Sequence, residues 1–246
     1  MLILLPPSET KTPRAHGAPT TLESLSFPGL TAARRTVLTA LARTSATPDA
    51  LRVLGVPASL AAEVERNTTV LDSPATPAGR LYSGVLYDAL DLATLTGPAR
   101  RRANSWLVVV SAAYGALRMT DRVGGYRLAM DVDLPGVGRL GPWWREQLAG
   151  ELTAVAGQGL VVDCRSTTYL PAWHPSGAVA RRWVRVQVPG ASHHAKHTRG
   201  LVARHLCREG SAARTPAALA AGLADAFDVR LDPPARPGRA WELQVS

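Results

Sequence analysis

The chain has 246 residues, a formal net charge of +9, and a composition that is 46% hydrophobic and 19% charged. This hydrophobic fraction allows a sizeable core, and the length fits one large domain or two small ones. The opening apolar run over 2–5 is too short for a signal peptide, and no later run reaches the roughly 18 residues of a membrane span. We therefore expect one cytoplasmic domain over 1–246 with no membrane partner. The sequence does not indicate an oligomeric state.

In chain order, the first half of the sequence predicts a buried strand at 2–5, a Pro- and Gly-rich loop at 13–28 and a helix at 31–43. Two short helices joined by a glycine turn follow over 47–64, and a proline-rich loop over 72–79. A short apolar element at 81–86 comes next, then a helix near 98–104 and a central strand at 106–110.

The second half predicts a helix at 142–156 whose inner face carries Trp144, Leu148, Leu152 and Val155. Strands follow at 160–164, 183–188 and 241–245, with helices at 196–208 and 216–227. Strands and helices alternate without a regular βαβ rhythm. This favours an α/β to α+β class with a mixed sheet flanked by helices. Within the single domain we expect a helical hairpin subregion at 31–66 and a C-terminal extension at 228–246.

The helix pair over 47–64 is similar to a helix-hairpin-helix, in which backbone N–H groups at the hairpin bind a DNA phosphate. Its turn contains Gly55, but Pro57 stands where a second glycine is usual. Proline has no N–H group to offer a phosphate. An ordinary pair of packed helices is therefore the alternative interpretation.

All but two of the 28 basic residues are arginines, and the two lysines are Lys11 and Lys196. A basic excess favours a polyanionic partner such as nucleic acid, although a genome that prefers arginine codons produces the same excess. An ammonium group can lose its proton and act as a nucleophile, which a guanidinium cannot. The two lysines are therefore candidates for chemistry. Cys164 and Cys207 lie in apolar segments, and we expect both to be reduced core residues.

Familiar phosphate-loop, nucleophile-elbow and dinucleotide motifs are absent from the sequence. His193 and His197 have the spacing of zinc ligands on a helix, but no third ligand has a familiar spacing. Asp131 and Asp133 lie in a Pro- and Gly-rich turn, which explains them without a metal. We predict neither a metal nor a cofactor.

Three polar clusters follow apolar elements, at 8–11, 114–118 and 166–169. Side chains beyond the carboxyl ends of parallel strands converge on one crevice in open α/β sheets. If the three preceding strands are parallel neighbours, one polar cleft is expected. The segment 181–214 adds eight basic residues against one acidic residue, Glu209. It fits either a phosphate-binding surface or an ordinary solvated face.

Several motifs resemble those of the YaaA peroxide-stress family. They are the opening run at 1–11, Tyr82-Ser83-Gly84, the S-x-x-Y-G-x-L-R to Y-R-L-x-M stretch at 111–130, the S-x-x-Y at 166–169 and A-K-x-x-R-G-L at 195–201. The resemblance extends from residue 1 to about 227. Both lysines fall inside these motifs.

The resemblance implies a cytoplasmic protein of the oxidative-stress response that limits iron-driven damage to DNA. It also implies a distinctive α/β fold with a helix-hairpin-helix element, a positively charged cleft and DNA binding. By the same resemblance, the cleft would be lined by Lys11, Tyr82, Ser83, Arg118, Arg127, Tyr169, Lys196 and Arg199.

Two functional hypotheses follow. In the first, the protein binds DNA, and the DNA phosphates contact the basic cleft. In the second, it is an enzyme acting on a small anionic or nucleotide-like substrate: Lys11 or Lys196 is nucleophile or base with a lowered pKa, and Tyr114 or Tyr169 is the acid. The predicted ligand- or phosphate-binding residues are Ser8, Tyr82, Ser83, Gly84, Arg118, Tyr126, Arg127, Ser166 and Arg199. In a third hypothesis, the protein is a scaffold whose basic charge reflects only a genome that prefers arginine codons.

Overall fold

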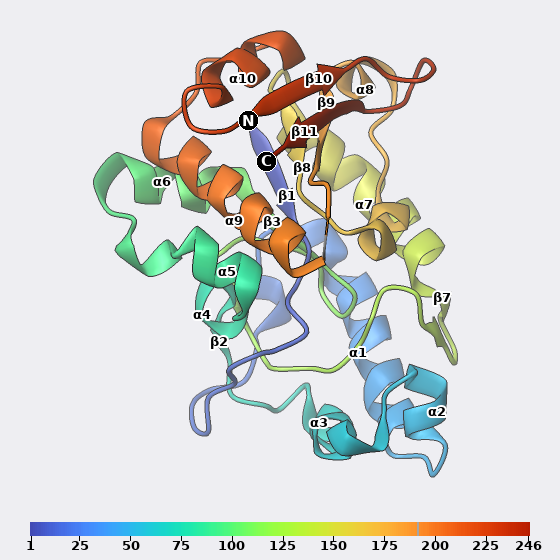
Figure 1. Cartoon of the computed structure of the whole chain (residues 1–246). Coiled ribbons are helices and arrows are strands. Elements are labelled where there is room, and N and C mark those ends of the chain that lie inside the picture. Colours follow the sequence, from blue (N-terminus) through green and yellow to red (C-terminus); the bar gives the residue numbers. More distant parts are fainter. Residues whose placement is uncertain (191) are drawn as a thin grey trace.

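The computed structural model describes residues 1–190 and 192–246 (Figure 1). The helices of this part of the chain are α1 (Thr31–Ser45), α2 (Ala50–Leu54), α3 (Ala61–Arg66), α4 (Ala78–Leu81), α5 (Val85–Leu90), α6 (Gly97–Trp106), α7 (Leu140–Ala156), α8 (Gly177–Ala180), α9 (Ser192–Glu209) and α10 (Pro216–Leu223). The strands are β1 (Leu2–Leu5), β2 (Thr76–Pro77), β3 (Leu107–Ser111), β4 (Gly115–Leu117), β5 (Arg122–Val123), β6 (Asp133–Leu134), β7 (Gly138–Arg139), β8 (Val161–Asp163), β9 (Trp183–Gln187), β10 (Val229–Asp232) and β11 (Trp241–Val245).

Among the described residues, seven strands form one mixed sheet in the order β10-β11-β9-β8-β1-β3-β4. β1 pairs in parallel with β3 on one side and β8 on the other, so that Ile3 lies opposite Leu107 and Val162. All residues of β1 and β3 are buried. A continuous apolar run covered on both faces is typical of a central parallel strand. The predicted mixed sheet flanked by helices is confirmed, and the condition for one polar cleft, that these three strands are parallel neighbours, is met.

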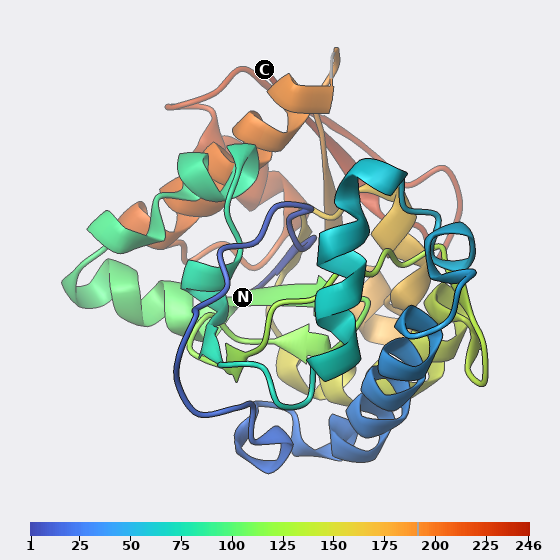
Figure 2. The same ribbon diagram turned by 90° about the horizontal axis from the view of Figure 1, so that it is seen from below.

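Helices cover both faces of the sheet. α5, α6 and α9 gather on one face, and α1 and α7 lie on the other (Figures 1 and 2). The inner face of α7 is set by Trp144, Leu148 and Leu152, which are fully buried. Val155 was expected on this face but is 36% exposed, and Ala156 is buried instead. Four-residue steps from Trp144 reach 156, because the helix turns once every 3.6 residues.

The predicted pair of short helices is present as α2 and α3. The turn between them begins at Gly55, whose φ of 64° lies in the left-handed region that suits glycine. The N–H groups of Gly55 and Val56 donate to Arg52 O and Leu51 O, at 3.3 and 2.9 Å. These two donors therefore close the end of α2.

The C-terminal segment 228–246 contributes β10 and β11 to the same sheet. β11 pairs in parallel with β9, and β10 forms the antiparallel edge. Trp241 of β11 lies opposite Val184. No helix in the described ranges combines the length and the apolar character needed to cross a bilayer.

Candidate functional site

A cavity opens where the sheet changes its direction of winding. From β1 the chain proceeds to β3 on one side, whereas from β8 it proceeds to β9 on the other. The β1–β8 boundary is therefore a topological switch point, the place where open α/β sheets bind ligands. The cavity beside the carboxyl ends of these strands has a volume of about 490 Å³. We call it the switch-point cavity.

Four chain segments and Ala129 line this cavity: the segments are the loop after β1 (6–10), the turn into α5 (83–87), the segment after β8 (166–169) and the first turns of α9. Seven of the residues selected from the sequence are among them. They are Ser8, Ser83, Gly84, Ser166, Tyr169, Lys196 and Arg199.

The loop after β1 is fastened to the turn that precedes α5. Ser83 N donates to Ser8 Oγ at 3.1 Å, and Lys11 forms an isolated antiparallel bridge with Tyr82. The Tyr87 hydroxyl donates to Pro6 O at 2.7 Å. These bonds hold two walls of the cavity in a fixed relation.

Close packing of α9 on α5 brings the basic residues of α9 to the cavity. A Cβ added at Gly200 would lie 2.2 Å from Leu86 O, so only glycine permits this approach. Lys196 and Arg199 precede it by four residues and by one, and both line the cavity. Arg199 Nε donates to Val186 O at 3.2 Å, which orients its guanidinium. The glycine of the A-K-x-x-R-G-L motif thus has a packing role.

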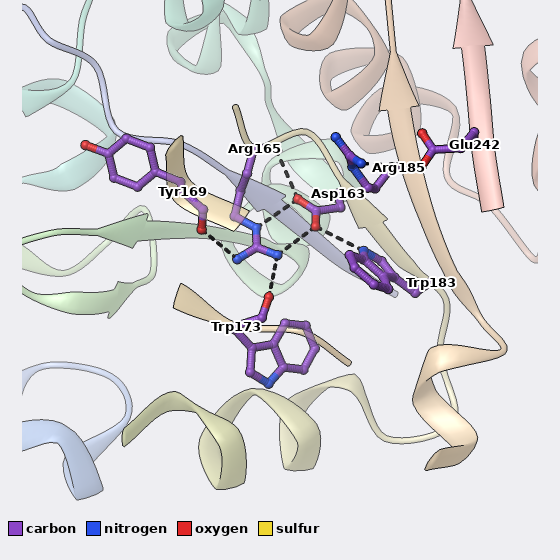
Figure 3. Close-up of polar contacts among 7 residues, drawn as sticks. All are labelled: Asp163, Arg165, Tyr169, Trp173, Trp183, Arg185 and Glu242. Atoms are coloured by element: carbon purple, nitrogen blue, oxygen red, sulfur yellow. Dashed lines mark hydrogen bonds and ion pairs between the residues drawn. The ribbon is translucent and has the colours of Figure 1, made fainter. Parts of the chain in front are cut away.

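A buried ion pair supports the segment after β8 (Figure 3). Arg165 Nε and Nη2 donate to the two Asp163 carboxylate oxygens at 2.9 and 2.7 Å. The remaining guanidinium protons reach Tyr169 O at 3.1 Å and Trp173 O at 2.8 Å, and Trp183 Nε1 donates to Asp163 at 3.0 Å. Burial acts to raise the pKa of Asp163, but Arg165 and these hydrogen bonds outweigh it, so the pKa is lowered. The network fixes the backbone that carries Tyr169 into the cavity.

Sequence reasoning missed Asp163 and Arg165 as supporting residues. The sequence feature that could have identified them is an acidic residue inside an apolar strand, followed two residues later by an arginine. Residues i and i+2 lie on the same side of a strand, so the two charges can meet. Both side chains have an exposed fraction of 0%.

Tyr169 is buried at the cavity wall, and its position favours a protonated hydroxyl. Burial raises its pKa above the ordinary value, and the charge of Glu9 raises it further. Behind it, the Tyr126 hydroxyl lies 3.1 Å from the Tyr82 hydroxyl and 2.7 Å from Ser111 Oγ. Burial also raises the pKa of Tyr82, to about 12.

The structure separates the two lysines. Lys196 is exposed at the switch-point cavity, whereas Lys11 lines a smaller cavity of about 200 Å³ on the other side of the loop after β1, together with Tyr126. Arg127 lies beside this loop and pairs with Glu9 at 3.1 Å and Glu63 at 3.5 Å. Burial lowers the pKa of Lys11 to about 8.

The second polar cluster of the sequence does not join the others. After β3 the chain reverses into β4, which runs antiparallel to β3 and returns to the amino end of the sheet. Arg118 therefore donates to Ser105 O, just before β3 begins. Tyr114 is fully buried, with its hydroxyl donating to Gly124 O at 3.3 Å. Arg118 and Tyr114 lie away from the switch-point cavity.

Many arginines are engaged within the fold. Those that donate to backbone carbonyls include Arg34, Arg100, Arg102, Arg118, Arg122, Arg145, Arg182, Arg199 and Arg204. A planar guanidinium with five donors is well suited to binding several carbonyls at once. The net charge by itself therefore does not locate a phosphate-binding surface. Within 1–190 and 192–246, no three His, Cys, Asp or Glu side chains are grouped so as to hold a metal ion.

The sheet and its cavity define an open-sheet α/β protein of the kind that places a site at a topological switch point. The chain belongs to the family described as peroxide stress protein YaaA, whose model matches residues 1–230. A UPF0246 protein of Streptomyces coelicolor is 48% identical over 254 residues, covering 100% of this chain and 98% of the relative. A UPF0246 protein of Corynebacterium efficiens is 42% identical, covering 90% of this chain and 92% of the relative. The resemblance found in the sequence is confirmed.

Proposed function

We propose that this member of the peroxide-stress family binds, and acts as an enzyme on, a small anionic or nucleotide-like substrate in the switch-point cavity. The observation that carries the proposal is the convergence of Lys196, Arg199, Tyr169 and three serines on one cavity at the carboxyl ends of β1 and β8. A volume of about 490 Å³ suits a small molecule, since such sites span roughly 300–1,000 Å³.

Each of these residues has a role that follows from its placement. Arg199, oriented by Val186 O, binds a phosphate or carboxylate group of the substrate through its remaining N–H donors. Lys196 supplies a second positive charge from the same helix. Tyr169, kept protonated by its surroundings, donates a hydrogen bond to an oxygen of the substrate. Ser166 supplies a further hydrogen bond at the end of β8.

The test is a binding screen of nucleoside phosphates and small carboxylates by isothermal titration calorimetry. We expect at least one of these anions to bind, with the Kd raised at least about tenfold in Lys196→Ala and in Arg199→Gln. Arg208→Gln is the matched control, because Arg208 lies on the same helix, is exposed and pairs with Glu209. Equal affinities in all four proteins, or no binding by any anion, would refute the proposal.

DNA binding is the second candidate function, and the α2–α3 pair favours it. Arg52 and Arg66 lie on the two helices, whereas the N–H groups of Gly55 and Val56 at the turn between them are bonded within the chain. Arg66 also lines the smaller cavity with Arg14 and Lys11, so basic groups gather beside this helix-hairpin-helix-like element. In this role the protein would protect DNA from iron-driven damage, with Arg52 and Arg66 contacting phosphates along a basic cleft.

A salt series of duplex binding tests this candidate. We expect log affinity to fall linearly with log salt, with a slope of about −0.9 for each phosphate contacted. Arg52→Gln with Arg66→Gln should make that slope shallower by about two phosphates. Arg230→Gln serves as the control, since Arg230 lies on the distant edge strand β10. Failure to bind a duplex at low salt removes this candidate and leaves the first unaffected.

A further inference from the structure

The smaller cavity has a chemistry of its own. Its volume is about 200 Å³, and its lining includes Lys11, Arg14, Glu63, Arg66 and Tyr126. Among the described residues, it shares no lining residue with the switch-point cavity. The loop after β1 separates the two. We call it the Lys11 cavity.

The Lys11 amine is held in place by the groups around it. Its Nζ donates to Ser8 O at 2.9 Å. It lies 4.3 Å from the centroid of the Tyr126 ring and 5.9 Å from that of Tyr82. Because one proton is directed at a carbonyl and the aromatic rings cover part of the group, the amine has a defined orientation within the cavity.

The charges that face Lys11 come from three elements and act in opposite senses. Burial lowers its pKa to about 8, against the opposing effects of Glu9 in the loop after β1 and Glu63 on α3. Arg127, like burial, lowers the pKa of Lys11. It also pairs with Glu9 and Glu63, so these carboxylates stabilise the Lys11 ammonium less strongly. At about pH 7.4, a pKa near 8 leaves roughly one-fifth of the amines neutral, against on the order of one in a thousand for an ordinary lysine.

We propose that Lys11 is a nucleophilic amine that forms an imine with a small, negatively charged carbonyl compound bound in the Lys11 cavity. Arg14 and Arg66 line the same cavity and bind the negative charge of that compound. The site thus selects a 2-oxo acid or an aldehyde acid over a neutral aldehyde. This proposal does not depend on the function proposed for the switch-point cavity.

The reaction balances without a further reactant. The lone pair of neutral Lys11 forms a bond to the carbonyl carbon as the C=O π bond breaks, and the oxygen takes up one proton from solvent water, which gives a carbinolamine protonated on nitrogen. The carbinolamine then loses its hydroxyl group as water, and a protonated imine remains. An arginine at this position could not react, because its guanidinium does not deprotonate in proteins. This accounts for a lysine in a chain whose basic residues are otherwise nearly all arginines.

The experiment traps the imine in the full-length protein with glyoxylate and sodium cyanoborohydride at about pH 7.4. Peptide mass spectrometry then compares Lys11 with Lys196, which serves as a reference within the same molecule. We expect Lys11 to be alkylated at least about tenfold faster than Lys196, and this preference to vanish in urea. Equal rates at the two lysines in the native protein would overturn the proposal.

Two variants test the separate parts of the inference. Lys11→Arg should lose the label at this position and retain duplex-DNA binding if the protein has it, which separates amine chemistry from charge. The double variant Arg14→Gln with Arg66→Gln should slow labelling by glyoxylate at least about threefold and leave labelling by propanal unchanged. Equal slowing with both reagents would show that the two arginines do not select the anion, and would overturn that part.

Discussion

The Asp163 carboxylate and the Arg165 guanidinium form a fully buried ion pair two residues apart, with Arg165 Nη2 2.7 Å from Asp163 Oδ2. A buried pair of this kind can contribute little net stability, because both charges lose their hydration. Removal of one partner is strongly destabilising, because the other charge then stays buried without a compensating charge. In this chain the pair also fixes the segment that carries Tyr169.

Arg165→Met should lower the free energy of unfolding by about 3–5 kcal/mol at neutral pH, because it leaves Asp163 buried without its partner. The pKa of Asp163 is lowered in the folded chain, so the unfolded chain takes up its proton first as the pH falls. The stabilisation is complete above the unfolded value of about 3.9 and is lost as the pH falls through the lower folded pKa. In the variant, burial without Arg165 raises the pKa of Asp163, so the difference between variant and wild type should begin to shrink above about pH 4 as that carboxyl takes up a proton, and should shrink further below it.

Urea denaturation at three or four pH values measures this effect. Arg230→Met is the matched control, since Arg230 and Asp232 have the same spacing and lie 3.1 Å apart on the exposed edge strand. That substitution should cost less than about 1 kcal/mol. Equal losses in the two variants would mean that burial does not determine the strength of the first pair.

Gly200→Ala should destabilise the protein by about 1–3 kcal/mol, because its Cβ would lie 2.2 Å from Leu86 O and push α9 away from α5. The same shift should weaken any anion bound by Lys196 and Arg199. Gly150→Ala is the control: Gly150 lies within α7 with open space around it. There the substitution should stabilise by roughly 0.5–1 kcal/mol, as alanine favours a helix. Thermal unfolding of the two variants provides the comparison.

Between about pH 8 and 9.5, Lys11 makes a contribution to the free energy of unfolding that rises with pH. Its pKa is about 8 in the folded chain against an ordinary value of 10.5, so over this interval the unfolded chain holds the additional proton. Cys164 and Cys207, whose pKa values burial raises to about 12, act with the opposite sign over the same interval, and Tyr82 does so near and above pH 10. The cysteines and tyrosines are common to both proteins, so the free energy of unfolding of wild type minus that of Lys11→Met should rise over this interval in chemical denaturation. A difference that does not change with pH would exclude this contribution of Lys11.

Neither cysteine should respond to peroxide in the folded protein. Cys164 and Cys207 are fully buried, and burial raises the pKa of each thiol to about 12. Peroxide oxidises the thiolate, which is scarce at such a pKa. We expect no sulfenic acid after treatment of the native protein and rapid reaction of both thiols in urea. Oxidation of either cysteine in the native state at the unfolded rate would contradict this expectation.

The centre of the fold could be predicted from the sequence, and its edges could not. β1, β3 and β8 are runs of apolar and β-branched residues that need cover on both faces, and such runs identify buried parallel strands. β10 contains Arg230 and Asp232 on an exposed edge, and β4 consists of Gly115, Ala116 and Leu117. Strands this short or this polar carry no distinctive periodicity.

The candidate site was predicted in part for a related reason. Two of the three polar clusters follow strands that end at the same edge, and they meet at the switch-point cavity. The third follows β3, where a tight turn at Gly115, with φ of 72°, reverses the chain. That reversal takes Arg118 to the opposite edge. Whether a strand continues into a crossover or returns as a hairpin depends on this turn, and the polar pattern does not contain that information.

The loop after β1 separates the two cavities, and different residues of the loop line each of them. Ser8, Glu9 and Thr10 line one cavity, and the next residue, Lys11, lines the other. The backbone is tied to Tyr82 and Ser83 at both ends of this stretch, so its residues cannot slide relative to the walls. A single inserted or deleted residue here would change which side chains line each of the two cavities. The length of this segment is therefore constrained more tightly than the identity of any one of its side chains.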